Sequence, residues 1–183
     1  FMKYPTNHFE KGNELLGKKK YEEAILSYEK ALKNGRLNTR YKILYNMGIA
    51  FNQLSRHKKA VKCYEKVLKN KEYPTPYKAW NNMGNSYYRM AQYNKAIECY
   101  EKALAEENYT SPGNTWFNMG LIYNQLKQYN KAIECYEKAM KDNQYIPLPN
   151  LWNEMTKAYN KIGHFDKTPD CLQKRNSLKS SYS

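Results

Sequence analysis

The sequence is poor in acidic residues and in long apolar runs. Its 183 residues include 17 aspartates and glutamates against 31 lysines and arginines, which gives a formal net charge of +14. No segment approaches the roughly 20 consecutive apolar residues that cross a membrane, so an integral membrane segment is excluded. Residues 1–5 lack the apolar region of a signal peptide. Phe1 precedes Met2, which indicates a fragment or an added residue, so targeting information or another domain could lie outside the numbered chain.

Residues suited to catalysis or metal binding are also scarce. The three histidines, His8, His57 and His164, are scattered and show no metal-ligand spacing. No nucleophile paired with a base, glycine-rich phosphate loop or metal cluster can be recognised. We therefore expect no enzymatic activity, no metal site and no cofactor.

The few cysteines do not form a disulfide framework. Cys63, Cys99, Cys135 and Cys171 are each 36 residues apart. Equivalent residues on stacked helices lie about 8–10 Å apart, which is farther than the Cα separation that a disulfide tolerates. We interpret them as half-buried packing thiols in a reducing compartment, which favours a cytoplasmic location.

The abundant feature of the sequence is internal repetition. Four glycines recur with a period of 36 residues, and the alanines and tyrosines that follow them keep the same step. The glycines are Gly12, Gly48, Gly84 and Gly120, and the tyrosines are Tyr28, Tyr64, Tyr100 and Tyr136. Such a period is typical of an array of one supersecondary unit. Each unit has two stretches with apolar residues three and four apart, as on one helix face, and a turn short enough for an antiparallel hairpin.

The motif W-x-x-M-G-x-x-Y at 80–87, followed by A-x-x-x-Y-x-x-A at 96–103, resembles the tetratricopeptide repeat. The resemblance covers nearly the whole chain in five repeats, the last of them degenerate. It implies an all-α fold, an α-solenoid (a right-handed superhelix) of stacked antiparallel helix pairs, in a single domain over residues 1–183. The predicted repeats are 5–40, 41–76, 77–112, 113–148 and 149–178, with a disordered tail at 179–183.

The sequence departs from the family pattern in three places. Each repeat has two extra residues, which fall between hairpins, where Tyr73, Tyr109 and Tyr145 are expected to pack them down. The closing proline of the repeat is displaced to the start of the next helix. In the fifth repeat, Pro169 interrupts the second helix, so we predict a shortened final helix over 169–178 with Thr168 as its N-cap.

The resemblance implies that the first helix of each pair lines an inner groove. At 100° per residue, the side chains opposite the core face of these helices point into it. The predicted peptide-binding residues are Asn46, Asn82, Asn118, Tyr45, Ile49, Lys78, Asn85, Tyr88, Arg89, Phe117 and Leu121.

Three of these residues form a series two positions before the glycines. Asn46, Asn82 and Asn118 each offer a donor and an acceptor, so they could hold the backbone of an extended peptide. The series resembles the asparagine ladder of the O-GlcNAc transferase repeats and of kinesin light chains. The alternative interpretations are a solvated polar face and asparagines bonded to neighbouring helices. A chaperone-type carboxylate clamp is disfavoured, because Phe9 and Asn82 stand where its lysine and arginine are expected.

Positive charge is concentrated in the second repeat. Residues 41–76 carry eight basic and two acidic side chains, a net charge of +6. The basic patch, which we expect on the convex side away from the groove, consists of Arg56, Lys58, Lys59, Lys62, Lys66 and Lys69. It could bind nucleic acid, an acidic protein or an anionic membrane surface, or it could be an ordinary solvated face.

The leading functional hypothesis is a non-enzymatic scaffold or adaptor that binds a protein or peptide segment in the groove. The second hypothesis is electrostatic binding through the basic patch at 56–69. A third is self-association through the stacked ends or the aromatic groove. The sequence does not identify the partner or the pathway, since tetratricopeptide arrays serve many processes.

Overall fold

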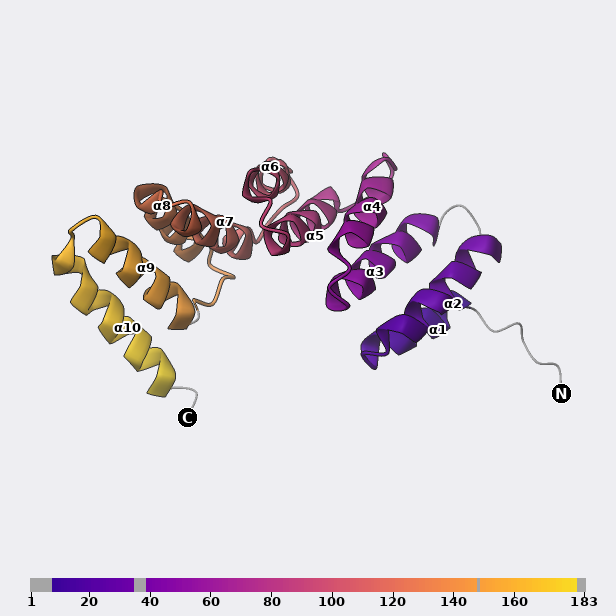
Figure 1. The fold of residues 1–183 in the computed structure, drawn as a ribbon, viewed down its shortest axis with the longest axis horizontal. Helices are drawn as coiled ribbons and strands as arrows, with labels where there is room; N and C mark the ends of the chain where they lie inside the picture. The colour runs from indigo at the N-terminus through magenta and orange to yellow at the C-terminus, as the bar shows by residue number, and fades with distance from the viewer. Residues whose placement is uncertain (1–7, 35–38, 148, 181–183) are drawn as a thin grey trace. The chain divides into compact units, whose positions relative to one another are not determined.

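The computed structural model describes residues 8–34, 39–147 and 149–180, and within these ranges the chain is helical and has no strand (Figure 1). The helices are α1 (His8–Gly17), α2 (Tyr21–Asn34), α3 (Arg40–Gln53), α4 (His57–Leu68), α5 (Pro76–Arg89), α6 (Tyr93–Leu104), α7 (Gly113–Gln125), α8 (Tyr129–Met140), α9 (Pro149–Lys161), the 3-10 helix η2 (Phe165–Lys167) and α10 (Thr168–Ser180). None of the helices in these ranges has the length and apolar character needed to cross a membrane.

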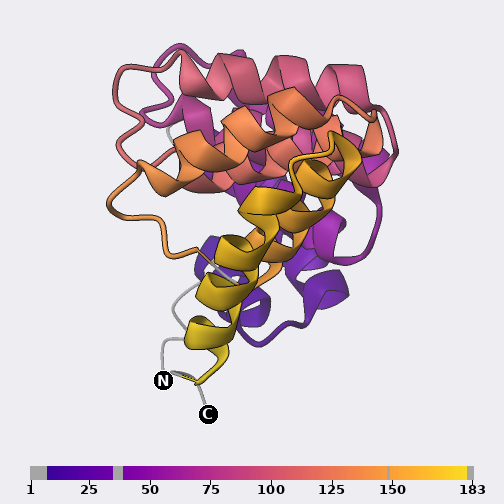
Figure 2. The same cartoon turned by 90° about the vertical axis from the view of Figure 1, so that its left-hand side faces the viewer.

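The helices are arranged as consecutive hairpins in two compact units, Phe1–Cys99 and Tyr100–Ser183, whose boundary falls within α6. In the first unit α1 packs on α2, α3 packs on α4, and α2 and α4 each contact the first helix of the next pair. In the second unit α7 pairs with α8 and α9 with α10, and α8 contacts α9. Figure 2 shows α9 and α10 side by side. The predicted all-α solenoid of stacked helix pairs is confirmed, and a single domain over residues 1–183 remains a prediction.

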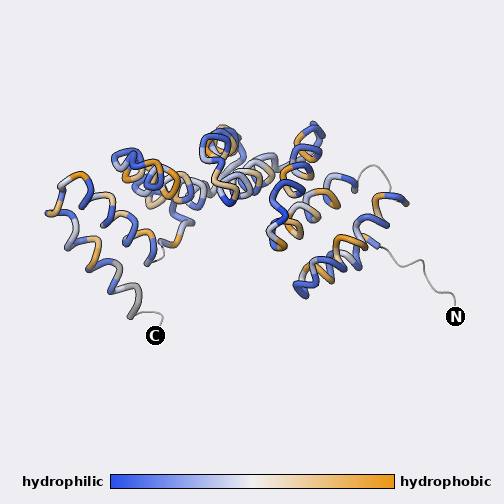
Figure 3. Tube along the Cα trace, viewed as in Figure 1, coloured by the Kyte–Doolittle hydropathy of each residue, from blue (hydrophilic) through white to orange (hydrophobic). Residues whose placement is uncertain are grey.

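The recurring glycine and tyrosine form the same contact inside three hairpins, α1–α2, α3–α4 and α7–α8. Tyr64 is completely buried, and a Cβ atom added to Gly48 would lie 2.6 Å from the Cε1 atom of its ring. Gly12 with Tyr28 and Gly120 with Tyr136 repeat this arrangement. The glycine is therefore required because the tyrosine ring occupies the space of any side chain. Along each helix apolar residues alternate with hydrophilic ones, as the core-facing pattern predicted (Figure 3).

The hairpin turns share a left-handed residue. Lys19, Ser55, Ala91, Lys127 and Gly163 occupy the same repeat position, and all have positive φ, from 55° to 80°. At Ser55 the backbone N–H donates to the Asn52 carbonyl at 2.9 Å, and the next N–H, of Arg56, donates to the Phe51 carbonyl at 2.8 Å. These bonds close the end of the first helix as a Schellman motif. Only the fifth turn uses glycine, so the sequence gives little sign of this geometry.

The extra residues of each repeat are held by aromatic packing, as predicted. The buried Tyr73 ring lies 5.5 Å from the Tyr41 ring between centroids, and the Tyr145 ring lies 6.4 Å from the Phe117 ring. The Tyr109 hydroxyl lies within hydrogen-bonding distance of Thr115 Oγ1, at 2.5 Å. Tyr73 and Tyr145 thus tie their connectors to the first helix of their own repeat, α3 and α7, and Tyr109 ties its connector to the helix that follows, α7.

The end of the fifth repeat differs from its prediction. The final helix α10 has 13 residues, one more than α4 or α8, so it is not shortened. Thr168 is its first residue rather than its cap, and its Oγ1 donates to Asn160 Oδ1 at 2.7 Å. The 3-10 turn η2 takes the place of the first helical turn, since Pro169 is tolerated only near a helix start. The helix continues through Ser180, two residues into the predicted tail; residues 5–7 and 181–183 lie outside the described residues.

Candidate functional site

The first helices of the first unit form a layer in which α3 contacts both α1 and α5. Most predicted groove residues of α3 and α5 are half-buried, and Lys78 and Arg89 are exposed. In the second unit, Phe117, Asn118 and Leu121 are half-buried on α7. Parts of these side chains are therefore accessible to solvent.

A polar pocket of about 410 Å³ lies among α3, the start of α4, and α5. Its lining residues are Ile49, Asn52, Gln53, Ser55, His57, Tyr64, Asn82, Asn85 and Arg89. The pocket brings together four of the predicted groove residues, Ile49, Asn82, Asn85 and Arg89. Tyr45, Asn46, Lys78 and Tyr88 are not part of its lining.

The side chain of Asn52 connects the walls of this pocket. Its Oδ1 accepts a hydrogen bond from Ser86 Oγ at 2.9 Å and lies 3.1 Å from His57 Nδ1. Its Nδ2 lies 3.4 Å from the Tyr64 hydroxyl. Burial, and then the charge of Arg89, lower the pKa of His57, which favours a neutral ring. A neutral His57 with its proton on Nδ1 donates to Asn52, so the polar wall is internally ordered.

Sequence reasoning missed the part played by His57 and Ser86. His57 occupies the repeat position that holds tyrosine at 21, 93 and 129, and Ser86 occupies the position of Ala50, Ile122 and Ala158. Both are departures from the repeat that the stacking of helices does not require. Two such departures in neighbouring repeats are the signal that could have located the pocket.

The asparagine series makes hydrogen bonds within the protein. Asn46 Nδ2 donates to Asn13 Oδ1 at 2.8 Å, and the Tyr28 hydroxyl donates to the same oxygen at 2.8 Å. Asn82 Nδ2 donates to the Tyr45 hydroxyl at 2.9 Å. One amide donor of Asn46 and one of Asn82 are therefore used between first helices, as one of the alternative interpretations anticipated. A carboxamide has a second donor and an acceptor.

All six residues of the basic patch are exposed, and they differ in what they contact. Arg56 makes a two-bond ion pair with Glu22, with distances of 2.6 and 2.9 Å. The Lys59 ammonium lies 5.6 Å from the centre of the Phe51 ring. Lys58, Lys62, Lys66 and Lys69 make no ion pair among the described residues.

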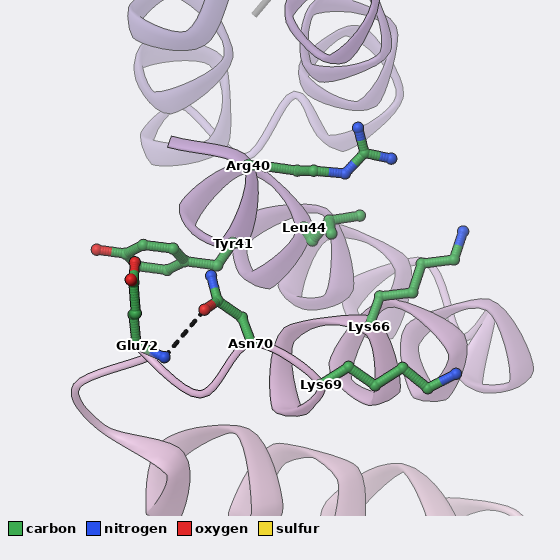
Figure 4. A pocket seen from close by; sticks show the side chains of 7 residues that line it. All are labelled: Arg40, Tyr41, Leu44, Lys66, Lys69, Asn70 and Glu72. Carbon is green, nitrogen blue, oxygen red and sulfur yellow. Dashed lines mark hydrogen bonds between the residues drawn. The ribbon is translucent and has the colours of Figure 1, made fainter. Parts of the chain in front are cut away.

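A second pocket, of about 740 Å³, lies where α3 begins and α4 ends (Figure 4). It is lined by Arg40, Tyr41, Leu44, Lys66, Lys69, Asn70 and Glu72. Since α3 is antiparallel to α4, this pocket is at the opposite end of the hairpin from the polar pocket. Arg40 was not among the predicted residues, although it stands where the next two repeats have Pro76 and Pro112.

None of the four cysteines forms a disulfide, which agrees with packing thiols, and all four are buried rather than half-buried as predicted. Burial raises the pKa of Cys63 to about 11 and that of Cys135 to about 11. Over the described ranges, no three His, Cys, Asp or Glu side chains are grouped in a way that could hold a metal ion.

Three family models, each described as a tetratricopeptide repeat, match residues 6–34, 41–73 and 77–143. Among solved structures, MamA (41-end) from Desulfovibrio magneticus RS-1 is 22% identical, with a TM-score of 0.79 over 95% of this chain and 94% of that chain. An RS-1 MamA double mutant is 21% identical, with a TM-score of 0.82 over 96% and 94%. BtubC (BKLC) from P. vanneervenii is 15% identical, with a TM-score of 0.79 over 93% and 78%. These likenesses show a shared fold. Among curated proteins, no sequence matches this chain.

Proposed function

The chain belongs to the tetratricopeptide repeat family, and from this we propose that it is a non-enzymatic scaffold that holds an extended segment of a partner protein along its first helices. Tetratricopeptide arrays bind protein partners, and stacking of repeats creates the extended surface that they use. The polar pocket is the proposed centre of this surface in the first unit.

The observation that carries the proposal is the convergence of predicted groove residues on one pocket. Ile49, Asn82, Asn85 and Arg89 come from two helices and line the same space of about 410 Å³. Carboxamides can engage the N–H and the C=O of an extended peptide, and each such bond contributes about 1 kcal/mol net. Arg89 is exposed and adds a charged contact for a carboxylate or carbonyl of the segment.

The internal hydrogen bonds of the asparagines favour this role. A donor bond from Asn82 to Tyr45 fixes the plane of the amide, so its oxygen and second N–H keep a constant direction. Fixing the side chain before binding lowers the entropy cost of capturing a ligand. In this proposal Asn46, bonded to Asn13, is oriented in the same way.

The second unit carries equivalent residues on α7. Phe117, Asn118 and Leu121 are half-buried and occupy the repeat positions of Tyr45, Asn46 and Ile49. Within the second unit we assign them the corresponding contacts with a partner segment, with Phe117 and Leu121 as apolar side-chain contacts.

A selection from a library of displayed random peptides tests the proposal. Peptides enriched on the wild-type protein are measured against Asn82→Ala/Asn85→Ala and against the control Asn94→Ala/Asn130→Ala. The control changes two exposed asparagines of second helices, so it has the same chemistry on another face. Affinity should fall about tenfold or more in the pocket variant, the equivalent of one or two hydrogen bonds, and remain unchanged in the control. Equal affinity of the peptides for both variants would refute peptide binding in the polar pocket.

A further inference from the structure

We propose that the pocket between the start of α3 and the end of α4 binds an acidic segment of a partner protein. This site is separate from the proposed groove. In Figure 4 the side chains of Arg40, Lys66 and Lys69 extend to the same side of the pocket, and the Glu72 side chain extends toward Tyr41 on the other side. The three cations are exposed and make no ion pair among the described residues.

The pocket depends on a leucine where the last three repeats have tryptophan. Leu44 occupies the position of Trp80, Trp116 and Trp152. In the second unit, the Lys138 ammonium lies 4.4 Å from the centre of the Trp116 ring, and Lys174 lies 5.1 Å from that of Trp152. These are cation–π contacts. Lys66 is the equivalent lysine, and Leu44 offers it no aromatic ring. The Lys66 ammonium therefore remains available to a ligand. Because leucine is smaller than tryptophan, it also leaves space for the pocket.

Two more departures increase the positive charge of the same pocket. Arg40 stands where the next two repeats have proline, and Asn70 stands where the fourth repeat has Asp142. Asp142 accepts hydrogen bonds from the Gly113 N–H at 2.8 Å and from Ser111 Oγ at 3.0 Å. Asn70 Oδ1 accepts from the Glu72 N–H at 3.0 Å (Figure 4), the same turn bond that Asp142 Oδ1 accepts from the Gln144 N–H at 2.9 Å, but Asn70 carries no charge. The turn that follows α4 therefore forms without a negative charge at this position.

The lysines of α4 and of its C-cap, Lys69, extend the pocket into a row. Lys58, Lys62, Lys66 and Lys69 follow one another at steps of four, four and three residues. At a rise of 1.5 Å per residue, the backbone positions of successive lysines are about 5–6 Å apart along the helix axis, in a row about 17 Å long. Glu65 is the acidic residue of α4, so positive charge dominates this face.

The spacing and lining favour a protein segment over a nucleic acid. Alternate side chains of an extended peptide lie about 7 Å apart on one side, which matches the lysine row, whereas duplex DNA has one charge per about 1.7 Å. Base stacking needs exposed aromatic faces, but the half-buried Tyr41 ring is packed against Tyr73. Leu44 and Tyr41 instead provide an apolar wall for the methylene groups of glutamate side chains.

The test measures three probes by fluorescence at physiological salt: a labelled peptide of alternating glutamate and alanine, a single-stranded thymidine oligonucleotide of equal charge, and vesicles containing phosphatidylserine. The pocket variant is Arg40→Gln/Lys66→Gln/Lys69→Gln. The control, Lys127→Gln/Lys138→Gln/Lys141→Gln, removes the same charge from exposed lysines of the second unit. Leu44→Trp introduces the tryptophan of the last three repeats without changing the charge.

The pocket variant should lose about tenfold in affinity for the glutamate peptide, as expected when charge-assisted hydrogen bonds are removed. Leu44→Trp should also weaken this peptide, and the control and Asn82→Ala/Asn85→Ala should leave it within about twofold, which is less than 1 kcal/mol. Equal losses of affinity in the pocket variant and the control would show that binding depends on net charge alone, which would overturn the proposal. Tighter binding of the oligonucleotide or the vesicles through the same residues would assign the site to another ligand class and overturn the proposal. Absence of binding of the glutamate peptide to the wild-type protein would overturn it as well.

Discussion

The Asn82 Nδ2 of α5 donates a hydrogen bond to the Tyr45 hydroxyl of α3, at a distance of 2.9 Å. Both residues were predicted to contact a bound peptide, and they contact each other across two repeats. Burial raises the pKa of Tyr45, and the bond from Asn82 partly offsets this, so the hydroxyl stays neutral and available as an acceptor. The surface proposed to bind a partner therefore also joins neighbouring repeats.

Removing this hydroxyl should destabilise the protein by a small amount. In Tyr45→Phe, the Asn82 N–H loses its acceptor, which is expected to cost about 1 kcal/mol of unfolding free energy. Urea unfolding followed by circular dichroism measures the change. The control is Tyr93→Phe, because the Tyr93 hydroxyl has no hydrogen bond among the described residues. Equal stability of Tyr45→Phe and wild type would contradict a structural role for the bond.

Gly48→Ala should destabilise the first unit more strongly. The new methyl group would lie 2.6 Å from the Tyr64 ring, and overpacking of this kind costs about 1–3 kcal/mol. Gly17→Ala is the matched control, because a Cβ there has nothing within 4 Å. The control should be neutral or more stable, by up to about 1 kcal/mol. Thermal unfolding that ranks the two variants in the opposite order would contradict the glycine–tyrosine contact.

Glycine at the hairpin turns should stabilise the chain. Ser55 has a φ of 57°, a conformation that strains residues with a Cβ atom, so Ser55→Gly should gain about 1 kcal/mol. Gly163 has a φ of 80° and open space around it, and Gly163→Ala should lose a similar amount through backbone strain alone. Chemical unfolding of the two variants measures both signs. A loss of stability in Ser55→Gly would mean that the turn is not left-handed.

Alkaline pH should unfold the protein through its buried tyrosines. Burial raises the pKa of Tyr28, Tyr73 and Tyr145 to about 12, from about 10 in the unfolded chain. Because the folded-state pKa is the higher one, the stability from these groups is complete below pH 10 and decreases as the pH rises from about 10 through about 12. Ultraviolet absorbance of tyrosinate and helical circular dichroism should change together for the buried rings. Complete ionisation of the buried tyrosines while the helices remain intact would contradict this prediction of alkaline unfolding.

The repeat positions were predictable from the sequence because one contact fixes each of them. Gly48 and Tyr64 recur in register since the hairpin closes only with no side chain beneath that ring. The connector tyrosines were predictable for the same reason, as Tyr73 packs on Tyr41. The turn residues were not, because Ser55 and Ala91 adopt left-handed backbone conformations that their residue types do not favour.

The candidate sites were only partly predictable. Helical periodicity places Asn82 and Arg89 on one face, but it does not show that Asn82 bonds to Tyr45 or that His57 and Asn52 complete the pocket. The predicted final helix is too short because Pro169 breaks the repeat pattern, whereas in the structure the 3-10 turn η2 precedes the proline and Pro169 is the second residue of α10. The role of Arg40 was not predictable because this residue lies at a repeat boundary, where the direction of a side chain does not follow from a helical period.

The most direct measurement of the groove is an NMR titration of the uniformly labelled protein with a peptide selected from the library. The side-chain amide resonances of Asn46, Asn82 and Asn85 should shift as the peptide is added, because their carboxamides form the proposed backbone contacts. Those of the exposed Asn94 and Asn130 should remain unchanged. Unchanged groove amides, with shifts confined to the backbone of α4 around Lys58 and Lys66, would contradict peptide binding along the first helices.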